Sequence, residues 1–108
     1  SQEQTIFENE ATGGVAMTSV LYGAHLASYR READAQAGWR VLQRAYPSEL
    51  SLLEPRLARV TVEGREVLRL VAGGFATTQK AGALCDALKK RNNRYCVVTS
   101  FDGEKLAN

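Results

Sequence analysis

The residues with the most chemical potential in this sequence of 108 residues are few: one histidine, His25, and two cysteines, Cys85 and Cys96. A histidine can act as a general base, a metal ligand or a hydrogen-bonding contact on a binding surface. A four-ligand zinc site would need carboxylates from unrelated positions, because the chain has only one histidine and two cysteines. We therefore predict no metal site and no cofactor, and the role of His25 depends on the direction in which its strand faces.

Alternation of apolar and polar segments predicts the order βαββαβ. Residues 18–28 and 95–100 are strand-like, and residues 59–72 are two strand-like runs around a tight Glu63-Gly64 turn. A helix over residues 31–46 and a second one, capped by Thr77 or Thr78, lie between them. The expected buried stripes of the two helices are Ala35, Trp39, Leu42 and Tyr46, and Ala81, Leu84, Cys85 and Leu88. The pattern predicts an α+β domain of the split βαβ, ferredoxin-like type, with a four-stranded antiparallel sheet and both helices on one face.

The two ends of the chain differ from this central domain. Residues 1–14 are polar, rich in glutamate and end in Gly-Gly, so we expect a linker or a loosely docked tail there. Residues 15–100 form the domain, and residues 101–108 contain an Asp-Gly turn signal and are expected to be a peripheral C-terminal tail. Since the chain starts at Ser1 rather than at Met, we expect a segment of a longer protein, with any membrane anchor outside it.

Strand alternation sorts side chains between the two faces of the predicted sheet. The helices should cover the more apolar set, which comprises Ala24, Leu26, Val60, Val62, Leu68, Leu70, Cys96 and Val98. The opposite, open face should carry His25, Arg59, Thr61, Arg69, Val71, Tyr95 and Val97. On that face His25 is either a binding contact or an ordinary solvated or packing histidine. A Cys–His pair is disfavoured because both cysteines fall on the covered side.

Cys85 and Cys96 lie on the buried side, one on the second helix and one on the last strand. We favour a disulfide between them, and two reduced core cysteines are the alternative. A bridge of this kind closes a short loop and would contribute about 2–3 kcal/mol to stability. It would also indicate an oxidising compartment.

Two segments, "YGAHLASYRREADAQAGWRVL" and "VLRLVAGGFATTQKAGALCDALKKRNNRYCVV", resemble the SPOR domain of bacterial division and cell-wall proteins. In that family an aromatic-x-Val-Gln-Leu-Gly-Ser-Phe box precedes the first helix, and a Tyr-Arg-Val-x-Val-Gly-Pro-Phe box precedes the second. Here "AHLASY" stands for the first box and "LRLVAGGF" for the second, and the similarity covers about residues 18–99. His25 stands in place of the family glutamine, Ala27 of glycine, Leu68 of tyrosine and Gly74 of proline.

The resemblance implies a non-enzymatic domain that binds peptidoglycan glycan strands lacking stem peptides. It implies a periplasmic location, at the end of a membrane-anchored or lipidated protein that is enriched at the division septum. The glycan would lie on the open face and its flanking loop. The residues expected to hold it are His25, Ser28, Tyr29, Thr61, Arg69, Val71 and Val97. A histidine at the glutamine position would make binding depend on pH.

Three other functions deserve comparison with glycan binding. A protein-interaction module could dock a division or cell-wall protein on the open face or an edge strand, with Val67, Val71 and Val97 as anchors. An RNA-binding module would need aromatic residues on the two central strands, where this chain has His25, Arg69 and Val71, and the net charge is only +2. An enzyme would need a nucleophile–base pair or a carboxylate pair on one surface, and the predicted faces provide none.

Overall fold

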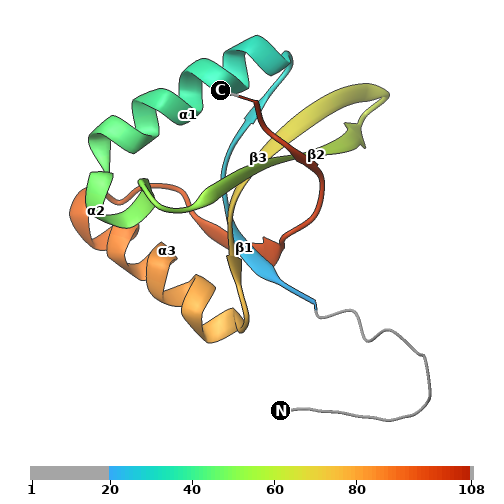
Figure 1. The fold of residues 1–108 in the computed structure, drawn as a ribbon. Helices are drawn as coiled ribbons and strands as arrows, with labels where there is room; N and C mark the ends of the chain where they lie inside the picture. The colour runs from blue at the N-terminus through green and yellow to red at the C-terminus, as the bar shows by residue number, and fades with distance from the viewer. Residues whose placement is uncertain (1–19, 108) are drawn as a thin grey trace, which may run out of the picture.

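The fold is an antiparallel sheet with helices packed on one side (Figure 1). The computed structural model describes residues 20–107. Its elements are β1 (Tyr22–Tyr29), α1 (Glu32–Ala45), α2 (Pro47–Leu50), β2 (Glu54–Val62), β3 (Arg65–Phe75), α3 (Thr78–Asn92), β4 (Val97–Ser100) and β5 (Glu104–Lys105). The strand order is β4-β1-β3-β2-β5, and every paired strand is antiparallel. The predicted split βαβ fold is confirmed, with a short fifth strand and a one-turn helix added to it.

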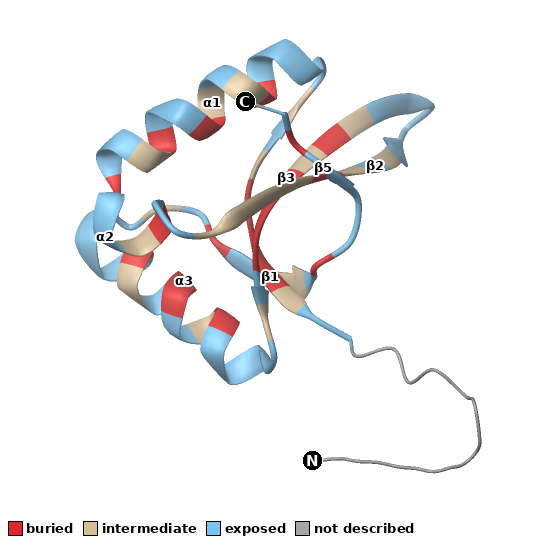
Figure 2. Ribbon diagram, viewed as in Figure 1, coloured by how far each residue is buried: buried red, intermediate tan, exposed pale blue. Residues whose placement is uncertain are grey.

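Both predicted helical stripes are buried against the sheet (Figure 2). Thr77 caps α3 by accepting a hydrogen bond from the Lys80 backbone N–H, and Asn93 ends it in the left-handed conformation. Pro47 ends the α1 stripe and occupies the first turn of α2, where its missing N–H costs nothing. Trp39 is 1% exposed, in agreement with its predicted place in the core.

The β2–β3 hairpin turns at Glu63 and Gly64, as predicted. Both residues have positive φ, 52° and 77°, which is the geometry of a two-residue type I′ turn. The turn fixes the register, so that Val62 pairs with Arg65 and Thr61 pairs with Glu66. The register also fixes the face of the sheet on which each side chain lies, because residues directly opposite each other on paired strands point to the same face.

This register corrects the predicted faces of β2. Arg59 pairs with the buried Leu68, so Arg59 and Thr61 lie on the helix side, whereas Val60 and Val62 lie on the open face. Apolar character suggested the opposite arrangement. It was misleading because β2 contributes Leu57, not the valines, to the core. The partly buried Val60 and the exposed Val62 lie toward the turn, where the hairpin projects beyond the helices (Figure 2).

The segment after β4 is part of the fold rather than a peripheral tail. Phe101 and Leu106 are 7% and 5% exposed, and β5 pairs with β2. The predicted N-terminal tail, residues 1–14, lies outside the described residues. None of the helices in residues 20–107 is both long and apolar enough to span a membrane.

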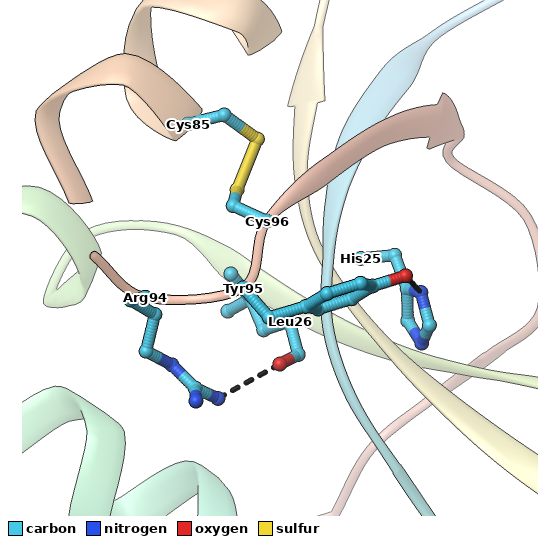
Figure 3. Close-up of a disulfide and its surroundings, with 6 residues drawn as sticks. All are labelled: His25, Leu26, Cys85, Arg94, Tyr95 and Cys96. Carbon is cyan, nitrogen blue, oxygen red and sulfur yellow. Dashed lines mark hydrogen bonds between the residues drawn. A yellow bond between two sulfur atoms is a disulfide. The ribbon is translucent and has the colours of Figure 1, made fainter. Parts of the chain in front are cut away.

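A disulfide joins Cys85 on α3 to Cys96 just before β4, with 5.1 Å between their Cα atoms (Figure 3). The predicted disulfide between the two cysteines is therefore confirmed. The bridge ties α3 to the edge of the sheet that β4 forms. It thereby fixes the start of β4 beside β1, next to the candidate site.

Candidate functional site

An irregularity in β1 brings polar side chains together on the open face. His25 pairs with Val71, but Ala27 pairs with Leu70, so Leu26 is an extra residue in the strand, a β-bulge. Strict alternation would place Ser28 with Leu26 on the helix side. The bulge shifts the alternation by one, and Ser28 instead pairs with Arg69 on the open face.

The bulge has a polar partner of its own. The Arg94 guanidinium donates a 2.8 Å hydrogen bond to the Leu26 carbonyl (Figure 3). A buried carbonyl left without a partner would be costly, so this contact stabilises the bulged conformation. Arg94 is a residue that sequence reasoning missed, because nothing in the sequence signals the bulge that it supports.

Four side chains form the His25 cluster: His25, Ser28, Arg69 and Tyr95. His25 Nδ1 lies 3.0 Å from the Tyr95 hydroxyl and 3.4 Å from Arg69 Nη2, and His25 Nε2 lies 3.1 Å from Ser28 Oγ. The Tyr95 ring meets the imidazole edge-on, with 5.3 Å between centroids. Figure 3 shows the Tyr95 hydroxyl directed at the imidazole.

The chemistry of arginine selects one imidazole tautomer. Because a guanidinium only donates, Nδ1 must accept, and the Tyr95 hydroxyl also donates to it. Nε2 then carries the proton and donates to Ser28 Oγ. The Tyr95 hydroxyl at 3.0 Å and the Arg69 guanidinium at 3.4 Å then share the single lone pair of Nδ1.

The environment of His25 favours the neutral imidazole. Only 7% of the residue is exposed, and desolvation by burial lowers its pKa, with the charge of Arg69 lowering it further. A backbone hydrogen bond at Ala27 opposes this shift. The pH dependence expected from a histidine is therefore displaced toward lower pH.

The cluster places the Ser28 hydroxyl in contact with the imidazole. The arrangement is nevertheless unsuited to nucleophilic catalysis. Nε2 donates to Ser28 Oγ, so it has no lone pair with which to take the serine proton. In place of the carboxylate that would stabilise an imidazolium, Nδ1 faces the cationic Arg69. His25 therefore orients the Ser28 and Tyr95 hydroxyls rather than activating one of them.

The open face has one accessible end and one covered end. Tyr95 of the His25 cluster is 53% exposed, and Val97, which pairs with His25, is 44% exposed. Val71 lies on the same face but is 1% exposed, which corrects its expected role as an accessible contact or anchor. A Cβ added to Gly23 would come within 2.6 Å of Val71 Cγ1 and 3.2 Å of Phe101 Cδ1, so Phe101 packs over this end of the face.

Two other predicted contacts lie on the helix side of the sheet. Tyr29 pairs with Leu68 and packs against the core, with its ring against Gly38 of α1. Thr61 is exposed near the hairpin turn but faces away from His25. The structure thus brings His25, Ser28, Arg69 and Val97 together, and it places Tyr29 and Thr61 elsewhere.

The open face also has a depression of about 400 Å³ at the hairpin end, lined by Arg30, Val62, Glu63, Arg65 and Val67, which we call the hairpin pocket. Sequence reasoning missed it. The two-residue turn contained the signal, because it forces Val62 and Arg65 onto the face that carries Val67 and Arg69. Within residues 20–107, no group of three or more His, Cys, Asp or Glu side chains could hold a metal ion.

A split βαβ sheet with one uncovered face and a preorganised polar cluster defines a small binding domain. The family model of the SPOR domain matches residues 19–99. The chain therefore belongs to the SPOR domain family, whose members bind peptidoglycan in proteins of bacterial cell division. Neither the comparison with curated proteins nor the comparison with solved structures gave a match.

Proposed function

We propose that this domain binds peptidoglycan glycan strands whose stem peptides have been removed, and so holds its parent protein at the division septum. The observation that carries this proposal is the His25 cluster, a set of mutually hydrogen-bonded side chains on an uncovered sheet face. Family membership supports peptidoglycan as the polymer.

The cluster suits a sugar because it offers both hydrogen-bonding groups and an apolar surface. Hydroxyl and N-acetyl groups can pair with Ser28 Oγ, the Tyr95 hydroxyl and the Arg69 guanidinium. The Tyr95 ring and Val97 provide a surface against which a pyranose face can pack. Sugar binding is favoured when such groups are already held in place, because less side-chain entropy is lost.

The buried His25 has a different role from its neighbours. With only 7% of its surface exposed, it has little area to offer a ligand, and its two nitrogens are occupied by cluster members. We therefore assign it as the residue that positions Tyr95 and Ser28. In this role it can replace a glutamine, since both side chains donate and accept a hydrogen bond.

The chemistry of the bridge supports the proposed location. A disulfide such as Cys85–Cys96 forms and persists in an oxidising compartment. We propose the bacterial periplasm, with a membrane-anchored or lipidated parent protein. Peptidoglycan is accessible in the same compartment.

Co-sedimentation with purified sacculi, before and after an amidase strips the stem peptides, tests the proposal. Binding of the 108-residue chain should rise on stripping, and Arg69→Ala should reduce it more than tenfold. Arg40→Ala removes the same charge from the exposed surface of α1 and serves as the matched control. Equal binding to both preparations would contradict the preference for bare strands, and no binding to either would contradict the function.

A second candidate is docking of a division or cell-wall protein, and one observation favours it. β4 is an edge strand, and its first residue Val97 and the preceding Tyr95 are about half exposed, which suits addition of a partner strand. Retention of a purified division protein without any sacculus binding, abolished by Val97→Asp, would select this function.

A further inference from the structure

The hairpin pocket is a second feature of the open face that glycan contacts at the His25 cluster do not use. Arg65, Val67 and Arg69 alternate along β3 on one face, and Val62 joins them through its pairing with Arg65. Arg65 lies four residues from Arg69, roughly 13 Å along an extended strand. That separation is the scale of a short oligosaccharide, so one strand of glycan can reach both places.

The pocket has an excess of positive charge. Within residues 20–107, no acidic side chain pairs with Arg30, Arg65 or Arg69. The arginines that form ion pairs there are Arg31, Arg56, Arg59 and Arg91. Glu63 lines the pocket as well, so two guanidinium groups face one carboxylate.

The distribution of charged residues along the chain also gives the described residues an excess of positive charge. All 14 Lys and Arg residues lie after residue 20, whereas three of the 12 Asp and Glu residues precede it. Residues 20–107 therefore carry a formal charge of +5, against +2 for the whole chain. A domain with this net charge attracts an anionic polymer.

Removal of a stem peptide changes the charge of the glycan. Hydrolysis of the amide between the lactyl group of muramic acid and the first amino acid adds water across that bond. The peptide leaves with a free amine, and the sugar keeps a carboxylate. Bare glycan thus has an anion at a position where peptide-bearing glycan has a neutral amide.

We propose that the hairpin pocket binds this lactyl carboxylate through the guanidinium groups of Arg30 and Arg65. A guanidinium presents its N–H groups in a fork that matches a carboxylate, and it has no comparable interaction with an amide. The exposed Val62 and the partly buried Val67 provide apolar contact for the lactyl methyl group and the sugar ring. This inference rests on the proposed function, and it supplies a reason for the preference for stripped strands.

The test compares two forms of the same bare glycan oligosaccharide. One has free lactyl carboxylates, and in the other they are coupled to methylamine as neutral amides. Capping should weaken binding of the unmodified chain about three- to tenfold, the range of an exposed charge pair with hydrogen bonds. Arg65→Gln should bind the free carboxylate form less well and should lose less affinity on capping than the unmodified chain does, because only Arg30 remains, whereas Arg40→Gln should behave as the unmodified chain does.

Arg30→Gln gives a second, independent variant on another element, and Glu63→Asn should strengthen binding of the carboxylate form. Equal binding of both glycan forms by the unmodified chain would overturn the inference and leave glycan binding intact. A loss of affinity on capping that is undiminished in both Arg65→Gln and Arg30→Gln would place the lactyl carboxylate elsewhere. Equal competition by an oligonucleotide of the same charge would reduce the pocket to a nonspecific anion site, and binding of neither glycan would overturn the proposed function too.

Discussion

The two faces of the sheet use neighbouring residues for opposite purposes. On the helix side, Leu68 and Leu70 are at most 2% exposed and pack under α1 and α3. On the open face, Arg69 lies between them in sequence and contacts the polar His25 cluster. Because successive strand residues point to opposite faces, one strand can contribute both to stability and to binding. Substitutions one residue apart should therefore separate the two properties.

The largest expected effect comes from Leu70→Ala. It removes a fully buried side chain and should lower the free energy of unfolding by about 2–5 kcal/mol. Arg69→Ala should change the free energy of unfolding by no more than about 1 kcal/mol while reducing binding to stripped sacculi more than tenfold. Urea denaturation of both variants measures the stability difference. A large loss of stability in Arg69→Ala would show that Arg69 is a structural residue and would contradict the separation of stability and binding between the two faces.

Loss of the disulfide should have the next largest effect, again on stability alone. Replacing Cys85 and Cys96 with alanine should cost about 2–3 kcal/mol, because the bridge restricts the unfolded chain. At temperatures where the variant stays folded, its affinity for stripped glycan should be unchanged. Alkylation under denaturing, non-reducing conditions should label neither cysteine of the periplasmically expressed chain. Two labelled thiols would refute the bridge.

The helix side also has a glycine that makes room for Tyr29. A Cβ at Gly38 would lie 2.6 Å from Tyr29 Cζ, so Gly38→Ala should destabilise the fold by about 1–3 kcal/mol through overpacking. Gly82→Ala on α3 is the matched control, since the nearest atom to its Cβ is Val98 Cγ2 at 4.0 Å. That variant should gain up to about 1 kcal/mol from helix propensity. If Gly38→Ala were stabilising instead, Tyr29 would not be packed here.

The smallest effect is the pH dependence of the open face. The pKa of His25 is lowered in the folded state, so the unfolded chain binds the proton more readily. The contribution of neutral His25 is present above its ordinary pKa of 6.5 and is lost as the pH falls below that value. Urea midpoints at pH 5.5 and 7.5 should differ less for His25→Gln than for the unmodified chain. An equal difference in both would assign the dependence to other groups.

The elements and the core could be predicted from the sequence because each has a local signal. The stripe of Trp39 and its neighbours has helical spacing, Thr77 is a good cap, and Glu63-Gly64 is a recognisable turn. The fifth strand lacked such a signal, since it has only two residues and forms through pairing with β2. Phe101 was missed for a similar reason, because its burial depends on glycines of β1 and β3 that are distant in sequence.

The site was harder to predict because register decides which residues meet. His25, Arg69, Tyr95 and Val97 were assigned to the open face by simple alternation, and the structure places them there. The bulge at Leu26 changes that alternation and turns Ser28 toward the open face and Tyr29 toward the core. In β2, the two-residue turn sets the register, and the register decides which side chains face the helices. Val60 and Val62 therefore lie on the open face although they are apolar.

The most direct test of the account is to add stripped glycan oligosaccharide to the isotope-labelled chain and follow its amide NMR signals. The account predicts shifts at His25, Ser28, Arg69 and Val97, with smaller ones at Arg65. The indole N–H of Trp39, the single tryptophan and a core residue of the helix side, should stay in place. Shifts concentrated on α1 and α3, with the open face unchanged, would contradict the claim that the uncovered sheet face binds the glycan.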